Sequence, residues 1–138
     1  MRNHLFSSFI LLTSSFLLLA VGCASSRPQG PVYSATSLVR LDSTVPAGEA
    51  KRRAIATARA QVRQQLMTWA YQLRINDGRT LEDLAVVDPF VRAVVDDTIR
   101  RANIVDQALD DDGVLTLTIA MDLAPLYKLV ADYDKHSI

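Results

Sequence analysis

Residues 102–122 read ANIVDQALDDDGVLTLTIAMD, and this stretch decides the fold class. From Val114 to Met121, apolar side chains alternate with small or hydroxyl side chains, a period of two that is typical of a strand with one face on a core. The polar run 110–113 ends in a glycine, which adopts positive φ at no steric cost. The sequence therefore predicts a hairpin, and with it an antiparallel sheet.

The longest regular pattern lies upstream of the hairpin. Apolar residues recur every three or four positions and form one stripe, which consists of Ile55, Ala58, Val62, Leu66, Trp69 and Leu73. Pro46 suits a first helical turn, and residues 42–44 offer capping side chains before it. Asn76-Asp77-Gly78 accepts the left-handed conformation that closes helices. We expect one long amphipathic helix that starts near Pro46 or Ala47 and ends at this turn.

Shorter elements complete the predicted domain. Val32–Leu41 is rich in β-branched and aromatic residues and predicts a strand, whose inward face is Tyr33, Ala35, Ser37, Val39 and Leu41. Thr80–Asp83 resembles a capping box that opens a short helix, and Asp88-Pro89 interrupts and restarts it. The restarted helix has an apolar face of Phe90 or Val91, Val94, Val95, Thr98 and Ile99. Asp122 can cap a last helix, with Leu126, Leu129, Val130 and Tyr133 on one side.

The order of these elements predicts an α+β fold. A small antiparallel β-sheet is expected to be covered on one face by the long amphipathic helix and the shorter helices, which makes two layers. Domain boundaries follow from composition: a lipoprotein signal peptide at 1–22, a lipidated N-terminus and flexible tether at 23–32, the domain at 33–133, and a frayed tail at 134–138.

The first 22 residues have the three parts of an export signal. Arg2 supplies an early positive charge, and the uncharged run from Leu5 to Ala20 follows. That run of roughly 16 residues is shorter than the roughly 20 that a membrane-spanning helix needs. Ala20-Val21-Gly22-Cys23 then resembles a lipobox, the motif at which bacteria attach diacylglycerol to the cysteine thiol and cleave just before it.

Cys23 is the only cysteine, so no disulfide partner exists within the chain. We therefore predict that Cys23 is lipidated, the alternative being a plain secreted protein with a free thiol. Several acyl chains would hold the domain firmly to a leaflet, which one chain does not. Ala24 is not Asp, which by resemblance to the sorting rule of enteric-type bacteria favours the outer membrane. The predicted location is the outer membrane, lipid-anchored, with the domain facing the periplasm.

Charge and residue types argue against nucleic-acid binding and catalysis. Without residues 1–22 the chain has 14 basic and 15 acidic residues, a balance that creates no global field for nucleic acid. His4 leaves with the signal, His136 lies near the chain end, and Cys23 carries lipid, so the usual nucleophile and base are missing. We expect no enzyme activity and no cofactor.

The acidic residues have structural interpretations. Asp88, Asp106 and Asp122 are interpreted as caps and strand-edge groups rather than as a carboxylate-only hydrolase. Residues 110–113 are interpreted as a hairpin turn rather than a calcium loop, because an EF-hand needs alternating ligands and a closing glutamate. No glutamate follows Glu82, so no metal site is expected.

Residues 33–130 resemble the LPP-twenty family of small bacterial outer-membrane lipoproteins, whose domain is shared with flagellar proteins of the FlgP and FlgT type. The likeness is carried by the Ala-rich basic helix EAKRRAIA at 49–56 and by IRRANIVD at 99–106, which continues through DGVLTL at 112–117 into MDL at 121–123. The resemblance implies a non-enzymatic envelope protein with a helix packed on an antiparallel sheet. Some members of that family assemble into rings, so the resemblance also implies self-association.

These observations leave three functional hypotheses. The first is a structural or assembly role in the envelope through self-association or a protein partner, since a neighbour can extend an edge strand. The second is a binding module for lipid, lipopolysaccharide or peptidoglycan, which would use Arg52, Arg59 and Arg63 on the basic face of the long helix. The alternative interpretation of this face is that it contacts only solvent. The third, more distant, is a flagellar outer-membrane ring component of FlgP type.

Trp69 and Tyr71 are interpreted as core and boundary residues rather than a ligand platform.

Overall fold

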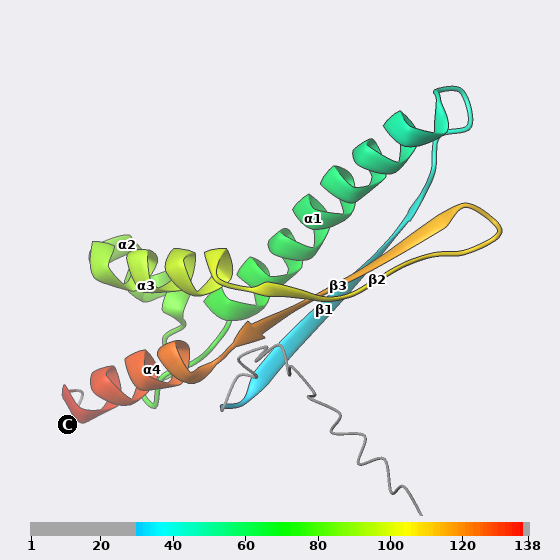
Figure 1. Cartoon of the computed structure of the whole chain (residues 1–138). Coiled ribbons are helices and arrows are strands. Elements are labelled where there is room, and N and C mark those ends of the chain that lie inside the picture. The colour runs from blue at the N-terminus through cyan, green and yellow to red at the C-terminus, as the bar shows by residue number, and fades with distance from the viewer. Residues whose placement is uncertain (1–29, 137–138) are drawn as a thin grey trace, which may run out of the picture.

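A three-stranded antiparallel sheet and a long helix across it organise the computed structural model, which describes residues 30–136 (Figure 1). The strands are β1 (Val32–Arg40), β2 (Asn103–Leu109) and β3 (Val114–Asp122), in the spatial order β1-β3-β2. The helices are α1 (Ala47–Tyr71), α2 (Leu81–Val87), α3 (Pro89–Arg100) and α4 (Ala124–His136). The predicted α+β class and the antiparallel hairpin are confirmed.

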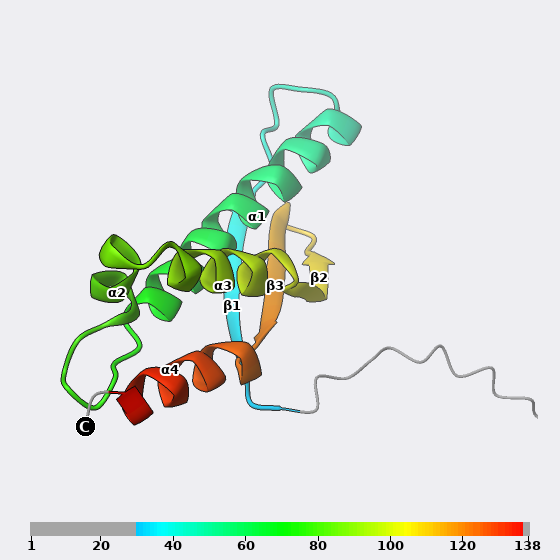
Figure 2. The same cartoon turned by 90° about the vertical axis from the view of Figure 1, so that its left-hand side faces the viewer.

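The core lies between α1 and one face of the sheet. α1 packs on β1 and β3, and Figure 2 shows it running over these two strands. The predicted alternation in β3 is confirmed, because Leu115, Leu117, Ile119 and Met121 are all buried. On β1, Ala35 and Ser37 are buried on the same side. Each buried apolar side chain is removed from water, which is the main stabilising contribution to such a fold.

Every fourth residue of α1 faces the sheet. The buried row consists of Ala50, Ala54, Ala58, Val62, Leu66 and Ala70. Alanine occupies four of these six positions, so the helix backbone can approach the strands closely. The stripe predicted from the sequence is shifted from this row: Ala58, Val62 and Leu66 belong to it, whereas Ile55, Trp69 and Leu73 pack only partly buried at its margins.

α1 ends at Tyr71, several residues before the predicted stop at Asn76-Asp77-Gly78. Ile75 is buried, which directs the chain off the helix axis into a tight loop. In this loop the Ile75 N–H donates to the carbonyl oxygen of Arg79 at 2.9 Å, and the Gly78 N–H donates to that of Ile75 at 3.0 Å. Gly78 has φ +89°, so the glycine serves this turn rather than a helix cap.

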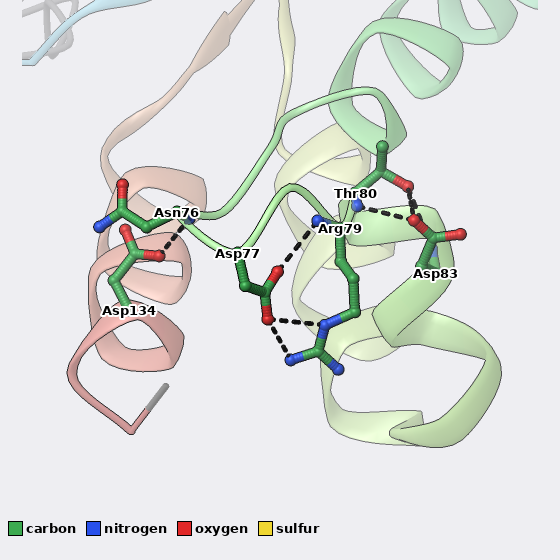
Figure 3. A network of polar contacts seen from close by, with 6 residues as sticks. All are labelled: Asn76, Asp77, Arg79, Thr80, Asp83 and Asp134. Carbon is green, nitrogen blue, oxygen red and sulfur yellow. Dashed lines mark hydrogen bonds and ion pairs between the residues drawn. The ribbon is translucent and has the colours of Figure 1, made fainter. Parts of the chain in front are cut away.

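The loop after α1 is fastened to both neighbouring helices (Figure 3). Asp77 accepts hydrogen bonds from the backbone N–H and the Nε of Arg79, at 2.9 and 2.8 Å. The backbone N–H of Asn76 donates to the Asp134 carboxylate at 2.7 Å. α4 continues to His136, so the prediction that the chain frays from Asp134 is wrong for residues 134–136. The bond from Asn76 gives Asp134 a structural role that the sequence pattern did not indicate.

Side-chain caps define the short helices as predicted. The capping box is complete, because the Asp83 N–H donates to Thr80 Oγ1 at 3.2 Å and the Thr80 N–H donates to Asp83 Oδ2 at 2.8 Å. Asp88 accepts from the Phe90 N–H at 2.8 Å and starts α3. Asp122 accepts from the Ala124 N–H at 2.9 Å at the start of α4.

The start of α1 is capped differently from the prediction. α1 begins at Ala47, as expected, but its N-cap residue is Pro46 and no side chain caps it. The Asp42 carboxylate instead accepts from the N–H and hydroxyl of Thr44, at 2.8 and 2.6 Å. Asp42 therefore closes a local turn, because an aspartate readily bonds the backbone two residues on.

The short helices gather at one end of the sheet, whereas the hairpin turn lies at the other (Figure 1). The described chain enters at the helical end, where the Leu123 N–H donates to the carbonyl oxygen of Pro31 at 2.9 Å. From there β1 runs toward the hairpin turn, and α1 returns. The sheet and α1 thus form an elongated body whose two ends are chemically different.

Candidate functional site

The predicted signal peptide, the lipobox Ala20-Val21-Gly22 and the lipidation site Cys23 lie outside the described residues. The candidate surface residues of α1 and the hairpin lie within them. None of the helices in the range 30–136 is long and apolar enough to cross a membrane.

α1 has an excess of positive charge, with five basic residues and one acidic residue in its 25 positions. The side of α1 toward β1 is marked by Gln61, which accepts a hydrogen bond from the Ser37 hydroxyl. Two residues turn an α-helix by about 200°. Arg59 and Arg63, each two positions from Gln61, therefore lie on the opposite flank of α1, toward β2, and both are exposed.

Arg52 lies nearer the start of the helix. It is two positions from both Ala50 and Ala54, which face the sheet, so it points away from the sheet and is exposed. Arg53 forms an ion pair with Glu49 on the surface. Arg52 is seven residues before Arg59, so the three arginines proposed from the sequence lie along one stripe of α1, with Arg52 about two turns nearer the start of the helix.

Several of the acidic residues are used in caps and turns. A hydrogen bond from the Tyr133 hydroxyl, joined by the Phe90 N–H, lowers the pKa of Asp88 from its ordinary value. Asp110 closes the hairpin by accepting from the Val114 N–H at 2.7 Å, and Gly113 there has φ +74°. Within residues 30–136 no three side chains of His, Cys, Asp or Glu are grouped to hold a metal ion.

A shallow cleft of about 370 Å³ lies beside the hairpin turn. Arg40, Asp42, Ser43 and Asp112 supply its polar lining, and Arg40 Nη1 donates to the Asp112 carbonyl oxygen at 3.3 Å. Asp42 is engaged with Thr44 in its own loop, and the Leu41 N–H donates to the Gly113 carbonyl oxygen at 2.8 Å, which joins the end of β1 to the hairpin turn. The cleft thus lies between the hairpin turn and the loop before α1. Its lining includes no histidine or cysteine.

Trp69 and Tyr33 form a stacked pair at the other end of α1. Their ring centroids are 4.2 Å apart and their planes differ by 13°. Both rings are partly buried and pack against the core, as predicted for Trp69. The stacking joins the end of α1 to the start of β1 and adds to the stability from burial.

The most open part of the sheet is β2, whose seven residues are all exposed. α1 covers β1 and β3 and leaves β2 without a covering element. Register places Ile104 opposite Ile119, Gln107 opposite Leu117 and Leu109 opposite Leu115, so these three β2 residues lie on the helix side of the sheet. An apolar strand with both faces open is an uncommon feature of an isolated domain.

A second apolar surface lies where α2 meets α3. Val86, Val87 and Phe90 are 79%, 74% and 64% exposed. The sequence left Phe90 and Val91 as alternatives for the core, and Val91 is the buried one. The exposure of these residues and of β2 was not predicted, although β2 lacks the strict alternation that marks β3.

No protein-family model matches this chain, and no curated protein matches it. The resemblance to the LPP-twenty family stays a prediction.

Proposed function

We propose that this protein is a lipid-anchored, non-enzymatic component of the outer membrane that acts in envelope structure or assembly by contact with copies of itself or with another envelope protein. The observation that carries the proposal is the open strand β2, which presents Ile104, Val105 and Leu109 to solvent. Exposed apolar strands at a sheet edge are sites at which other chains add or pack. Thr80, Asp83 and Asp88 are engaged in the caps of α2 and α3, so their side chains serve the fold.

The lipid anchor fits this proposal through the shape of the domain. Cys23 would lie a short tether away from Gly30, which is beside Asp122 and Ala124 at the start of α4. The sheet and α1 would then extend into the periplasm, since 25 helical residues span about 37 Å. Anchoring confines the molecules to two dimensions, which raises their local concentration and favours contacts that are weak in solution.

The proposal is tested by the oligomeric state of the full chain. The protein extracted from membranes in mild detergent is expected to sediment as a species larger than one chain. Val105→Asp combined with Leu109→Asp should shift it toward monomer, because both residues are exposed and burying a carboxylate in a contact is unfavourable. Leu38→Asp is the matched control, since Leu38 is 68% exposed on β1. A monomer at every concentration in the parent protein would contradict the proposal.

A second candidate function is binding of an anionic envelope polymer by the basic residues of α1. Arg52 supports it, because it points away from the sheet near the start of α1, and that end of the helix lies on the side of the hairpin turn (Figure 1). That position suits a polymer beyond the anchoring leaflet, such as peptidoglycan, better than the lipid next to the tether. Co-sedimentation with purified cell-wall sacculi tests it. Arg52→Glu should reduce binding, and unchanged binding would exclude this use of the residue.

A further inference from the structure

Three of the most exposed large apolar side chains within residues 30–136 gather where α2 meets α3. Val86 and Val87 are the last two residues of α2, and Phe90 is the second residue of α3. We call these three residues the α2–α3 corner. They lie outside the core, so removing them from water would be favourable and would not disturb the packing of the domain.

The carboxylates nearest to the corner are bonded to other parts of the domain. Glu82 and Asp83 lie in the first turn of α2, about 6 Å along the helix axis from the corner valines. Glu82 accepts a hydrogen bond from Gln72 Nε2 at 3.2 Å, and Asp83 accepts one from the Thr80 N–H at 2.8 Å. The apolar side chains of the corner can therefore leave water while these carboxylates keep their protein partners.

Charge gives the corner no preference for an acidic or a basic partner. Residues 79–101, which surround it in the sequence, contain four basic and five acidic side chains. Arg92 Nη2 donates to the Ala85 carbonyl oxygen at 3.3 Å, so a guanidinium also stands beside the end of α2. A corner of this kind suits a surface that buries apolar side chains without charge complementarity, and a zwitterionic lipid leaflet is such a surface.

The start of the described chain brings a leaflet within reach of the corner. A Cβ at Gly30 would lie 3.4 Å from the Cβ of Ala124. From Ala124, α4 runs about 14 Å to Tyr133, whose hydroxyl donates to Asp88 between α2 and α3, so the corner is on the order of 20 Å from Gly30. Cys23 is seven residues before Gly30, and seven extended residues span at most about 24 Å. A leaflet that touches the corner can thus hold a lipid on Cys23.

We propose that the α2–α3 corner inserts into the headgroup boundary of the leaflet in which Cys23 is anchored. This inference rests on the proposed function, because it needs the lipid on Cys23, and it adds a second contact with the same membrane. Three side chains alone bind a membrane weakly, but a short tether gives the corner an effective concentration of about millimolar at the leaflet.

The contact would also orient the domain. The short helices and the hairpin turn lie at opposite ends of the molecule (Figure 1). Ten residues of extended chain lead from Gly30 to Arg40 and span about 33 Å, which is longer than the tether. With the corner in the leaflet, the hairpin turn therefore points into the periplasm.

Quenching by brominated lipid tests this contact in the full lipidated chain. Val87→Cys and Leu38→Cys variants are purified from membranes, labelled with nitrobenzoxadiazole, and reconstituted in phosphatidylcholine vesicles with or without bromine on the acyl chains. Leu38 is the matched position, because it is 68% exposed against 74% for Val87 and lies on β1 near the hairpin turn. We expect the label at 87 to lose most of its fluorescence in brominated vesicles and the label at 38 to keep it. Equal quenching at the two positions would overturn the proposal.

Substitution of the other two corner residues tests whether the corner itself makes the contact. In the Val87→Cys chain, Val86→Gln with Phe90→Gln should lower the ratio of docked to undocked domain at least about tenfold, because two apolar side chains no longer enter the leaflet. Leu38→Gln with Leu109→Gln, at exposed positions near the hairpin turn, should leave the quenching unchanged. Full quenching in the Val86→Gln, Phe90→Gln chain would overturn the proposal.

The parent chain separates failure of this contact from failure of the proposed function. Its only cysteine is Cys23, so a lipidated parent chain takes up no label. A parent chain that takes up the label would contradict the anchor and the leaflet contact together. An unlabelled parent chain with no quenching at 87 would overturn the leaflet contact alone. A label at 87 that is shielded from aqueous iodide but not quenched by brominated lipid would show that protein covers the corner, which also overturns the leaflet contact alone.

Discussion

The alanine row of α1 allows a quantitative prediction about the packing of this helix on β1 and β3. Ala58 is fully buried at the centre of the row that faces β1 and β3. Ala58→Leu adds three carbon atoms where the helix approaches the sheet, and overpacking of this kind typically costs about 1–3 kcal/mol. For a domain of this size we expect the midpoint of thermal unfolding to fall by roughly 5–20 °C. Circular dichroism of the purified chain during heating measures the change.

Ala60→Leu is the matched control for this experiment. Ala60 lies two residues further along the same helix and is exposed, so the same substitution changes helix propensity equally without meeting the sheet. Its effect should stay within about 0.5 kcal/mol. Equal stability of the two variants would refute the conclusion that alanine at this row sets the distance between α1 and the strands.

Three further substitutions test other parts of the structure. Leu66→Ala removes a fully buried side chain of α1 and should lower the free energy of unfolding by about 2–5 kcal/mol, measured by urea titration with Trp69 fluorescence. The control is Leu38→Ala, at an exposed position. A loss as small as that of the control would show that Leu66 is not in the core. Thr80→Ala removes one side of the capping box and should cost about 1 kcal/mol in the same assay, while unchanged stability would mean that the cap is not formed in solution. The hydrogen bonds from Tyr133 and the Phe90 N–H hold the pKa of Asp88 in the folded state below its ordinary 3.8. The ionised carboxylate therefore stabilises the fold above pH 3.8, and this stability is lost as the pH falls through the lower pKa of the folded state. Asp88→Asn should therefore be less stable than the parent at pH 7 and should lose less stability on acidification, and parallel pH profiles for the two proteins would contradict this assignment.

Sequence periodicity predicted much of the fold because each of these signals is local. The alternation of β3 and the glycine of the hairpin turn depend on neighbouring residues alone, and so do the caps at Thr80, Asp88 and Asp122. Such short-range rules hold wherever no tertiary contact opposes them. At the end of α1 a tertiary contact does oppose them, because burial of Ile75 and the bond from Asn76 to Asp134 decide the path of the chain.

The candidate contact surfaces were less accessible from sequence for the same reason. Ile104 and Leu109 read as ordinary strand residues, and only the position of α1 over β1 and β3 leaves them exposed. Helical spacing did not separate Phe90 from Val91, which face opposite environments in α3. The arginines were identified as candidates, yet which flank of α1 holds Arg59 and Arg63 follows from the contact of Gln61 with Ser37. Which residues remain uncovered is a property of the whole fold.

Mass spectrometry of the protein isolated from membranes tests the proposed envelope role most directly. We expect the mature chain to begin at Cys23 and its N-terminal peptide to carry a diacylglycerol group on the sulfur. An unmodified Cys23 thiol, or a mature chain that begins at another residue, would contradict the proposed anchor and the arrangement of the domain on the membrane that depends on it.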